Sequence, residues 1–249
     1  MERKSANRLD RMSSVLYVCV RPERSAADAE HRSFARDLGI PELDRLDLLH
    51  ASLETVEWQQ YDGFVIGGSP FNVTDAVKDE TQQTVERDLE RIADRALTGA
   101  ATALFTCYGI GVVTRMLGGR VTMDHPERVQ AARIRLTPAG AEDPLFGPNA
   151  PAMSVFTAHK ESAAETPPDA VLLATRDDCP VQAYRVGEHL YATQFHPEAS
   201  PQDFADRMAV YRASGYFDPS EYAATERMVL SASVDGADLL GRFPALLGR

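Results

Sequence analysis

The sequence is poor in cysteine and has no long apolar run. Its three cysteines, Cys19, Cys107 and Cys179, are far apart and form no CxxC pair. This spacing excludes a disulfide framework and a cysteine-based zinc site, and it fits a reducing compartment. No apolar run approaches the roughly 18–20 residues that cross a membrane, and the apolar run 15–20 is too short for a signal-peptide core. We therefore expect a cytoplasmic protein with no membrane segment.

Positive charge is also scarce. The 249 residues contain 26 Lys and Arg against 37 Asp and Glu, which gives a net charge of −11. Binding to a phosphate backbone requires a basic patch, so nucleic-acid binding is excluded as a main activity. Repeats, low-complexity tracts and linkers are absent from the sequence as well. The length is then best accommodated by one α/β domain rather than two independent ones.

Apolar and amphipathic segments alternate along the first half of the chain. We predict strands over 15–20, 43–49, 61–66 and 101–105, and helices over 26–38, 79–97 and 109–117. This alternation predicts a three-layer α/β fold with a mostly parallel central sheet and helices on both faces. From residue 120 to 196 the segments are shorter and indicate an antiparallel or mixed extension, with strands over 129–136, 153–157, 170–174, 181–186 and 190–195.

The two ends of the chain differ from this core. Residues 1–13 are predicted to be disordered or loosely held, residues 14–200 to form the domain, and residues 201–249 to form a helical extension packed on it. We predict helices over 201–213 and 237–247, and a third that begins at Asp218-Pro219, with Asp218 as its N-cap. The extension either covers the sheet and the rim of a site, or provides a surface for a partner or a homodimer.

Cys107 lies at a corner between a predicted strand and a predicted helix. The apolar run 101–105 precedes it, and apolar residues recur at helical spacing from Gly109 onward. A side chain at this corner projects beyond the carboxyl end of the strand, where the first amides of the helix can stabilise a thiolate or an oxyanion. Gly109 keeps the turn open, as in a nucleophile elbow. The alternative is a plain buried thiol, because cysteine is among the residues most often buried.

Three loops follow other predicted strands and lie near the elbow in an α/β sheet. The Gly67-Gly68 pair lets backbone amides approach a ligand and donate to an oxyanion; its alternative is a tight turn. His196 can act as a general base whose ring Glu198 orients, with Pro197 stiffening the segment; its alternative is a capping turn. His159 can face a substrate, or it can be a solvated loop residue.

The order of these motifs along the chain resembles the class I glutamine amidotransferase superfamily. An upstream Gly-Gly loop, a strand–Cys–x–Gly elbow and a downstream Gln-Phe-His-Pro-Glu strand end occur in the order found in that family, and the resemblance covers residues 15–198. It implies a flavodoxin-like fold. Other stretches resemble a stand-alone subgroup that is similar to the glutaminase domain of GMP synthase and includes γ-glutamyl peptidases; these stretches are 65–70, 143–146, 159–161 and 179–183.

The resemblance implies a role for each motif residue. Cys107 would attack a γ-glutamyl amide to form a γ-glutamyl thioester, which water then hydrolyses. His196 would move the proton and Glu198 would orient His196, while the amides of Gly68 and Tyr108 would form the oxyanion hole. It implies neither a metal nor an organic cofactor. Weaker candidates for contact with the substrate are Gly67, Ser69, Gly109 and His159.

The sequence departs from the family at two places. The family usually has glycine two places before the cysteine, where this chain has Phe105, and it commonly has a substrate-holding glutamine at the position of Gly111. The missing glutamine favours a γ-glutamyl substrate other than glutamine itself.

Three functions remain open from the sequence. The first is a glutaminase that supplies ammonia to a separate synthetase subunit. The second is a free-standing γ-glutamyl hydrolase or peptidase. The third is a non-catalytic binding or regulatory module on the same fold, against which the complete set of Cys107, His196 and Glu198 argues.

Overall fold

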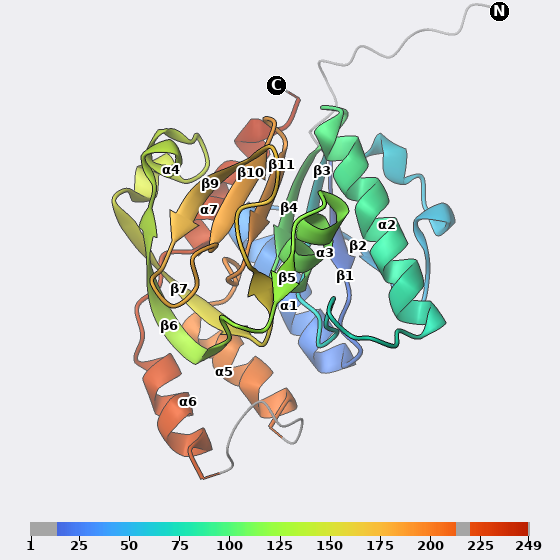
Figure 1. Cartoon of the computed structure of the whole chain (residues 1–249). Helices are drawn as coiled ribbons and strands as arrows, with labels where there is room; N and C mark the ends of the chain where they lie inside the picture. Colours follow the sequence, from blue (N-terminus) through green and yellow to red (C-terminus); the bar gives the residue numbers. More distant parts are fainter. Residues whose placement is uncertain (1–13, 213–219, 249) are drawn as a thin grey trace, which may run out of the picture.

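A nine-stranded sheet forms the centre of the molecule in the computed structural model, which describes residues 14–212 and 220–248. The strand order is β2-β1-β3-β4-β11-β10-β9-β6-β7 (Figure 1). Five strands run parallel, namely β2 (Asp44–Asp47), β1 (Val15–Cys19), β3 (Gly63–Ile66), β4 (Thr102–Thr106) and β11 (Leu190–Thr193). The predicted α/β class with a mostly parallel central sheet is confirmed.

The rest of the sheet is an antiparallel extension, as expected from the short strands after residue 120. It consists of β10 (Ala183–Val186), β9 (Ala170–Thr175), β6 (Glu127–Leu136) and β7 (Ala152–His159). A separate two-stranded sheet pairs β5 (Val121–Thr122) with β8 (Ser162–Ala163), and neither of these strands is evident in the sequence pattern because each has two residues.

Helices cover both faces of the parallel part because its strands are apolar on both sides. Leu16 and Val18 of β1 pack in one core with α2 (Glu80–Leu97) and α3 (Tyr108–Met116). The intervening Tyr17 packs in a second core with α1 (Arg24–Leu38) and α7 (Ala237–Arg242), on the opposite face (Figure 1). This alternation along one strand produces the three layers.

Helices also pack on the antiparallel extension. A third apolar cluster joins α5 (Pro201–Val210) and α6 (Tyr222–Leu230) to the antiparallel extension, where Phe204 stacks on Phe156 with ring centroids 4.6 Å apart. The short helix α4 (Pro138–Glu142) packs against β9. In the part of the chain that the structure describes, no helix is both long and apolar enough to cross a membrane.

The predicted helices differ from the observed ones mainly near the C-terminus. The predicted helix 237–247 is wrong in part: α7 ends at Arg242, and a 3₁₀ turn, η5 (Phe243–Leu246), follows. Pro244 explains the break, because it has no amide hydrogen to continue the α-helical ladder. Helix α5 ends at Val210, three residues earlier than predicted. The predicted start at Asp218-Pro219 and the N-terminal residues 1–13 lie outside the described residues.

Candidate active site

The ends of neighbouring parallel strands bring the candidate residues together. Thr106, the last residue of β4, pairs with Thr193 of β11, so Cys107 and His196 follow adjacent strand ends. Ile66 of β3 pairs with Phe105 on the other side of β4, which places Gly67 and Gly68 beside Cys107. The topology thus gathers three loops that are far apart in the sequence at the carboxyl edge of one sheet.

The backbone at Cys107 has the conformation predicted for a nucleophile elbow. Its φ and ψ angles are 51° and −101°, an unusual region for a residue with a Cβ, and α3 begins at the next residue. The amide of Cys107 donates to the carbonyl of Thr193 at 2.8 Å, which fixes the turn against β11. Because the side chain is only half-buried, the thiol is accessible at the start of the helix.

The bulky side chain at position 105 requires a glycine at position 109. A Cβ at Gly109 would lie 3.0 Å from the Cβ of Phe105, whose side chain is fully buried in the core under α3. The departure at Phe105 is therefore accommodated on the packed face of the sheet. Gly109 provides room for Phe105, which is a packing role rather than a contact with substrate.

His196 is paired with Glu198 and borders the same cavity as Cys107. His196 Nδ1 donates to Glu198 Oε1 at 2.9 Å, and both side chains are buried. The amide of His196 donates to the carbonyl of Phe156 at 3.0 Å, so the segment is held by β7 as well as by β11. This geometry orients the imidazole between a carboxylate and a thiol, the arrangement that a general acid–base residue requires.

Charge determines the protonation of this pair. Burial alone lowers the pKa of His196, but the negative charges of Glu198 and Cys107 outweigh burial and raise that pKa to about 9. Burial likewise raises the pKa of the Glu198 carboxyl, but the positive charges of His196 and Arg207 hold that pKa well below its usual range. At neutral pH the imidazole is therefore protonated and the carboxyl ionised.

Two arginines and a glutamate that the sequence pattern did not indicate surround the His196–Glu198 pair. Arg207 donates to Glu198 Oε1 at 2.9 Å, and its guanidinium lies 3.0 Å from His196 Nδ1, where its charge lowers the pKa of His196. Glu30 is fully buried and accepts from Arg21 at 2.8 Å, with Arg207 3.5 Å away. Arg21 has a sequence signal, since it follows the end of β1, whereas Glu30 and Arg207 are hidden inside amphipathic helices.

The Gly67-Gly68 loop is shaped by this support. A Cβ at Gly67 would overlap the carboxylate of Glu30, with the Glu30 Cδ only 2.9 Å away. A Cβ at Gly68 would lie 2.7 Å from a guanidinium nitrogen of Arg21 and 2.8 Å from His196 Cε1. Side chains at these two positions would therefore push the loop away from Glu30, Arg21 and His196.

The two expected oxyanion donors lie in different surroundings. The amide of Gly68 donates to Glu30 Oε1 over a long 3.4 Å. Tyr108 is the first residue of α3, where helix amides have no partner within the helix. Its hydroxyl donates to Glu86 at 2.9 Å on the other side of the helix, which anchors the residue in place.

His159 lies deeper than a substrate-facing loop residue. It is buried, and its Nε2 lies 2.8 Å from Glu127 Oε2 while its Nδ1 lies 3.1 Å from the carbonyl of Glu161. Glu127 is also held by Gln182 and Arg176, at 2.7 and 2.6 Å. The ring therefore belongs to a buried polar network behind the site, although one edge borders a cavity.

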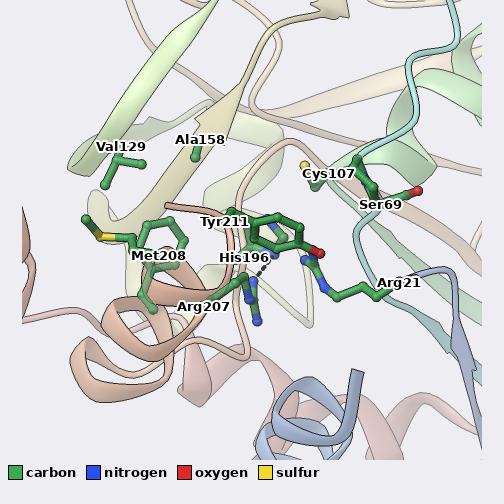
Figure 2. A pocket seen from close by; sticks show the side chains of 11 residues that line it. Arg21, Ser69, Cys107, Val129, Ala158, His196, Arg207, Met208 and Tyr211 are labelled. Atoms are coloured by element: carbon green, nitrogen blue, oxygen red, sulfur yellow. Dashed lines mark hydrogen bonds between the residues drawn. The ribbon is translucent and has the colours of Figure 1, made fainter. Parts of the chain in front are cut away.

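Two cavities meet at Cys107. The first, which we call the α5 cavity, has a volume of about 60 Å³, is partly open to solvent, and is lined by Cys107, His196 and residues of α5 (Figure 2). The second, the loop cavity, has a volume of about 30 Å³ and is bordered by Cys107, the 69–72 loop and the 158–161 segment. Ser69 and Ala158 border both cavities. His196 borders only the α5 cavity.

Neighbouring residues fill the space beside Gly111, the position at which the family commonly has glutamine. A Cβ there would lie 3.0 Å from Val73 Cγ2 and 3.6 Å from Glu161 Oε1. Glu161 in turn accepts from the amide of Thr74 at 3.0 Å and from its hydroxyl at 2.8 Å, and it also accepts from the amide of Val73. The loop thus occupies the volume that a glutamine side chain at position 111 would enter first.

Among the residues that the structure describes, two buried groups of side chains are compact enough to be considered as metal ligands: Glu30, His196 and Glu198, and Glu127, His159 and Cys179. Both groups contain carboxylates already neutralised by arginine, Glu30 by Arg21 and Glu127 by Arg176. Burial, as the largest cause, raises the pKa of the Cys179 thiol to about 12, which disfavours the thiolate that a metal needs. We therefore assign neither group to a metal.

The fold is a three-layer α/β sheet that carries a cysteine and a buried histidine–glutamate pair at its carboxyl edge, and sequence comparison identifies its family. Residues 42–210 match the family described as glutamine amidotransferase class-I, and the chain belongs to that family. Among curated proteins it is similar to the GMP synthase [glutamine-hydrolyzing] of two Yersinia pestis strains, Pestoides F and Angola. Each is 26% identical over 144 residues, which are 55% of this chain and 25% of the relative. The aligned region thus spans a quarter of those relatives' length.

Solved structures share the fold over nearly the whole chain. A glutamine amidotransferase from Thermotoga maritima superposes with a TM-score of 0.72 at 17% identity, covering 95% of this chain and 96% of that one. A glutamine amidotransferase from Methylobacillus flagellatus gives 0.69 at 16% identity, covering 96% and 97%. A Thermoplasma acidophilum protein described as a GMP synthase subunit gives 0.61 at 21%, covering 82% and 98%. At these identities the likeness establishes the fold, C-terminal helices included.

Proposed function

We propose that this protein hydrolyses a γ-glutamyl amide through Cys107, His196 and Glu198. The observation that supports this most directly is the buried His196–Glu198 pair beside an accessible cysteine at a helix N-terminus. The Cys107 thiolate attacks the γ-carbonyl carbon, and the amides of Tyr108 and Gly68 stabilise the oxyanion, the latter by turning from Glu30 to the substrate. The same pair argues against a non-catalytic module.

His196 then transfers its proton to the leaving nitrogen. The C–N bond breaks, the amine or ammonia departs, and a γ-glutamyl thioester remains on Cys107. Water attacks the thioester with His196 as the base, the C–S bond breaks, and glutamate is released. A histidine with a pKa of about 9 holds the required proton at neutral pH.

The loop cavity fits the glutamyl half of such a substrate. Gln194 Oε1 is buried there, and within the described residues it has no hydrogen-bond partner. An orphaned buried acceptor favours a ligand with a donor, such as the α-ammonium group of glutamate. Lys160 lines the same cavity, and an ammonium group is complementary to an α-carboxylate.

Two fates of the released nitrogen follow from different observations. The names of the curated relatives join glutamine hydrolysis to GMP synthesis, which favours transfer of ammonia to a synthetase partner. The glycine at position 111, whose surroundings are filled by Val73, favours instead a γ-glutamyl compound other than glutamine. In either case no cofactor takes part in the steps above.

The experiment that tests the proposal is glutamate release by the purified chain. The substrates are glutamine and a panel of γ-glutamyl amides and dipeptides, with Cys107→Ala as the inactive variant. Cys179→Ala is the matched control, because Cys179 is a buried thiol outside the triad, and it should keep its activity. Release that persists in Cys107→Ala, or a Cys107 that is inert to iodoacetamide with no turnover of any substrate, would refute the proposal.

A further inference from the structure

The position of His196 assigns the two cavities to the two halves of a substrate. This step rests on the hydrolysis proposed above. The leaving nitrogen must receive a proton from His196, and His196 borders only the α5 cavity. The group that leaves with that nitrogen therefore occupies the α5 cavity, and the glutamyl group occupies the loop cavity on the other side of Cys107.

The α5 cavity is far larger than ammonia requires. Its volume is about 60 Å³, whereas a cavity that holds one water molecule, which is similar in size to ammonia, needs roughly 10–15 Å³ by the same measure. A site that released only ammonia would need no such volume directly beside its general acid.

One side of this cavity is apolar. Val129 of β6 and Met208 of α5 lie together on one side in Figure 2, and Ala158 lies nearby above them. Phe204 adds an aromatic face, and Met208 is 2% exposed, so its thioether is held in place by packing. Apolar walls of this kind favour an apolar side chain in the leaving group.

The opposite side carries the guanidinium of Arg21, which is paired with Glu30 behind it. Arg21 lies across the cavity from Met208, with Cys107 and His196 between them in the view of Figure 2. Among the described residues that line the cavity, none is acidic, since Glu30 and Glu198 lie behind the guanidiniums that they hold. Arg21 donates from Nη1 to the hydroxyl of Tyr211 over 3.3 Å, a long hydrogen bond that a carboxylate in the cavity can replace with a charge-assisted one.

We propose that the α5 cavity binds an α-amino acid with an apolar side chain as the leaving group, so that the substrate is a γ-glutamyl dipeptide. The nitrogen lies at His196, the carboxylate faces Arg21 and the side chain contacts Met208 and Val129. Acylation forms the C–S bond and breaks the C–N bond, and His196 donates its proton to the departing amino acid. Hydrolysis adds water across the thioester, which returns the thiol and releases glutamate.

The first test compares substrates that differ only in the leaving group. We expect kcat/KM for γ-Glu-Leu to exceed that for glutamine by about tenfold or more, because a few methylenes in an apolar pocket give that discrimination. Conversion of the carboxylate to an amide, in γ-Glu-Leu-NH₂, should cost about tenfold, and γ-Glu-Asp should be poor. Equal turnover of γ-Glu-Leu, γ-Glu-Asp and glutamine would overturn the proposal.

The second test changes the cavity. Met208→Ala should reduce the ratio of γ-Glu-Leu turnover to glutamine turnover severalfold. Val129 is half-buried and lines the cavity, so Val129→Trp should fill part of the cavity and abolish the preference for γ-Glu-Leu. Met228→Ala is the matched control, since Met228 is a partly exposed residue of α6 outside the cavity, and it should leave the ratio unchanged. A ratio that does not respond to Met208→Ala would contradict the assignment.

The third test does not depend on turnover. L-leucine should slow the alkylation of Cys107 by iodoacetamide more than isoamylamine or L-aspartate does. Leucine has both a carboxylate for Arg21 and an apolar side chain for Met208 and Val129, whereas each of the other two compounds has only one of these groups. Protection by L-leucine without hydrolysis of any γ-glutamyl compound would refute the proposed reaction while upholding the subsite. Hydrolysis without preference or protection would refute the subsite while upholding the reaction.

Discussion

At the scale of single residues, the site is a balanced cluster of charges in a buried setting. Arg21, Arg207 and protonated His196 face Glu30 and Glu198 beside Cys107, and the nitrogen–oxygen distances of their four ion pairs are 3.5 Å or less. Buried charges persist only when paired, so each member depends on the others. The two partners of His196 act on its pKa in opposite directions.

The pH profile should reveal this opposition. Activity of the wild type should fall as pH rises through about 9, because His196 loses the proton that the leaving nitrogen needs. Glu198→Gln removes a charge that raises the pKa of His196, so the alkaline limb should move to lower pH. Arg207→Gln removes a charge that lowers it, so the limb should move to higher pH.

The measurement is kcat against pH for the four proteins, with Arg207→Lys as the charge-preserving control. Arg207→Lys should keep the limb near its wild-type position. If the alkaline limbs of Glu198→Gln and Arg207→Gln moved in the same direction, the opposite effects assigned to Glu198 and Arg207 on the pKa of His196 would be contradicted.

Glycine at position 67 is required by Glu30 rather than by a turn. In Gly67→Ala the new methyl group would overlap the Glu30 carboxylate, so we expect a loss of roughly 1–3 kcal/mol in the free energy of unfolding and a large loss of activity. Gly241→Ala, within α7, is the matched control, because a Cβ at this position would have only the carbonyl oxygen of Asp37 nearby, at 3.7 Å. That variant should be neutral or more stable by up to about 1 kcal/mol. Urea unfolding of both variants measures the difference.

At the scale of elements, the sequence predicts what depends on local pattern and misses what depends on tertiary contact. The parallel strands and the elbow at Cys107 were predictable, because apolar runs and the Cys-x-Gly turn are local. Glu30 and Arg207 were not, because nothing in a helical pattern tells a buried charge from an exposed one. The placement of His159 against Glu127 depends on a pairing between β6 and β7, which sequence spacing does not encode.

The loop between β3 and α2 gives the element-scale prediction. Glu161 accepts from the amides of Val73 and Thr74, which holds this loop over α3. Glu161→Ala should free both amides, and since a hydrogen bond to a charged group contributes about 1.5–3 kcal/mol, their hydrogen exchange should quicken by roughly ten- to a hundredfold. The KM for the substrate should rise, because the loop borders the loop cavity.

The control for this prediction is Glu165→Ala. Glu165 is exposed in the turn after β8, so its removal should leave exchange at residues 73 and 74 unchanged. Equal protection of the two amides in Glu161→Ala and the wild type would show that the loop is held by other contacts.

At the scale of the whole molecule, the C-terminal segment supplies parts to both the site and the core. Helix α5 contributes Arg207 and Met208 to the site and packs against α1, and α7 and η5 pack in the core that α1 and β1 share. A segment attached to the domain at both places should unfold together with the sheet. We therefore propose that residues 201–249 belong to the same cooperative unit as residues 14–200.

Leu240→Ala tests this proposal. Leu240 is fully buried in the core that α7 shares with α1, so its truncation should cost about 2–5 kcal/mol and lower Tm by roughly 2–4 °C for each kcal/mol. Leu230→Ala is the control, because Leu230 of α6 is 46% exposed, and its Tm should stay close to that of the wild type. If the extension were a separate unit, Leu240→Ala would instead produce an early transition seen by circular dichroism, while the fluorescence of Trp58, in the core under α2, kept its wild-type midpoint. A single transition, lowered equally by both probes, would establish that the helices beyond residue 200 are part of the domain that positions Arg207 at the triad.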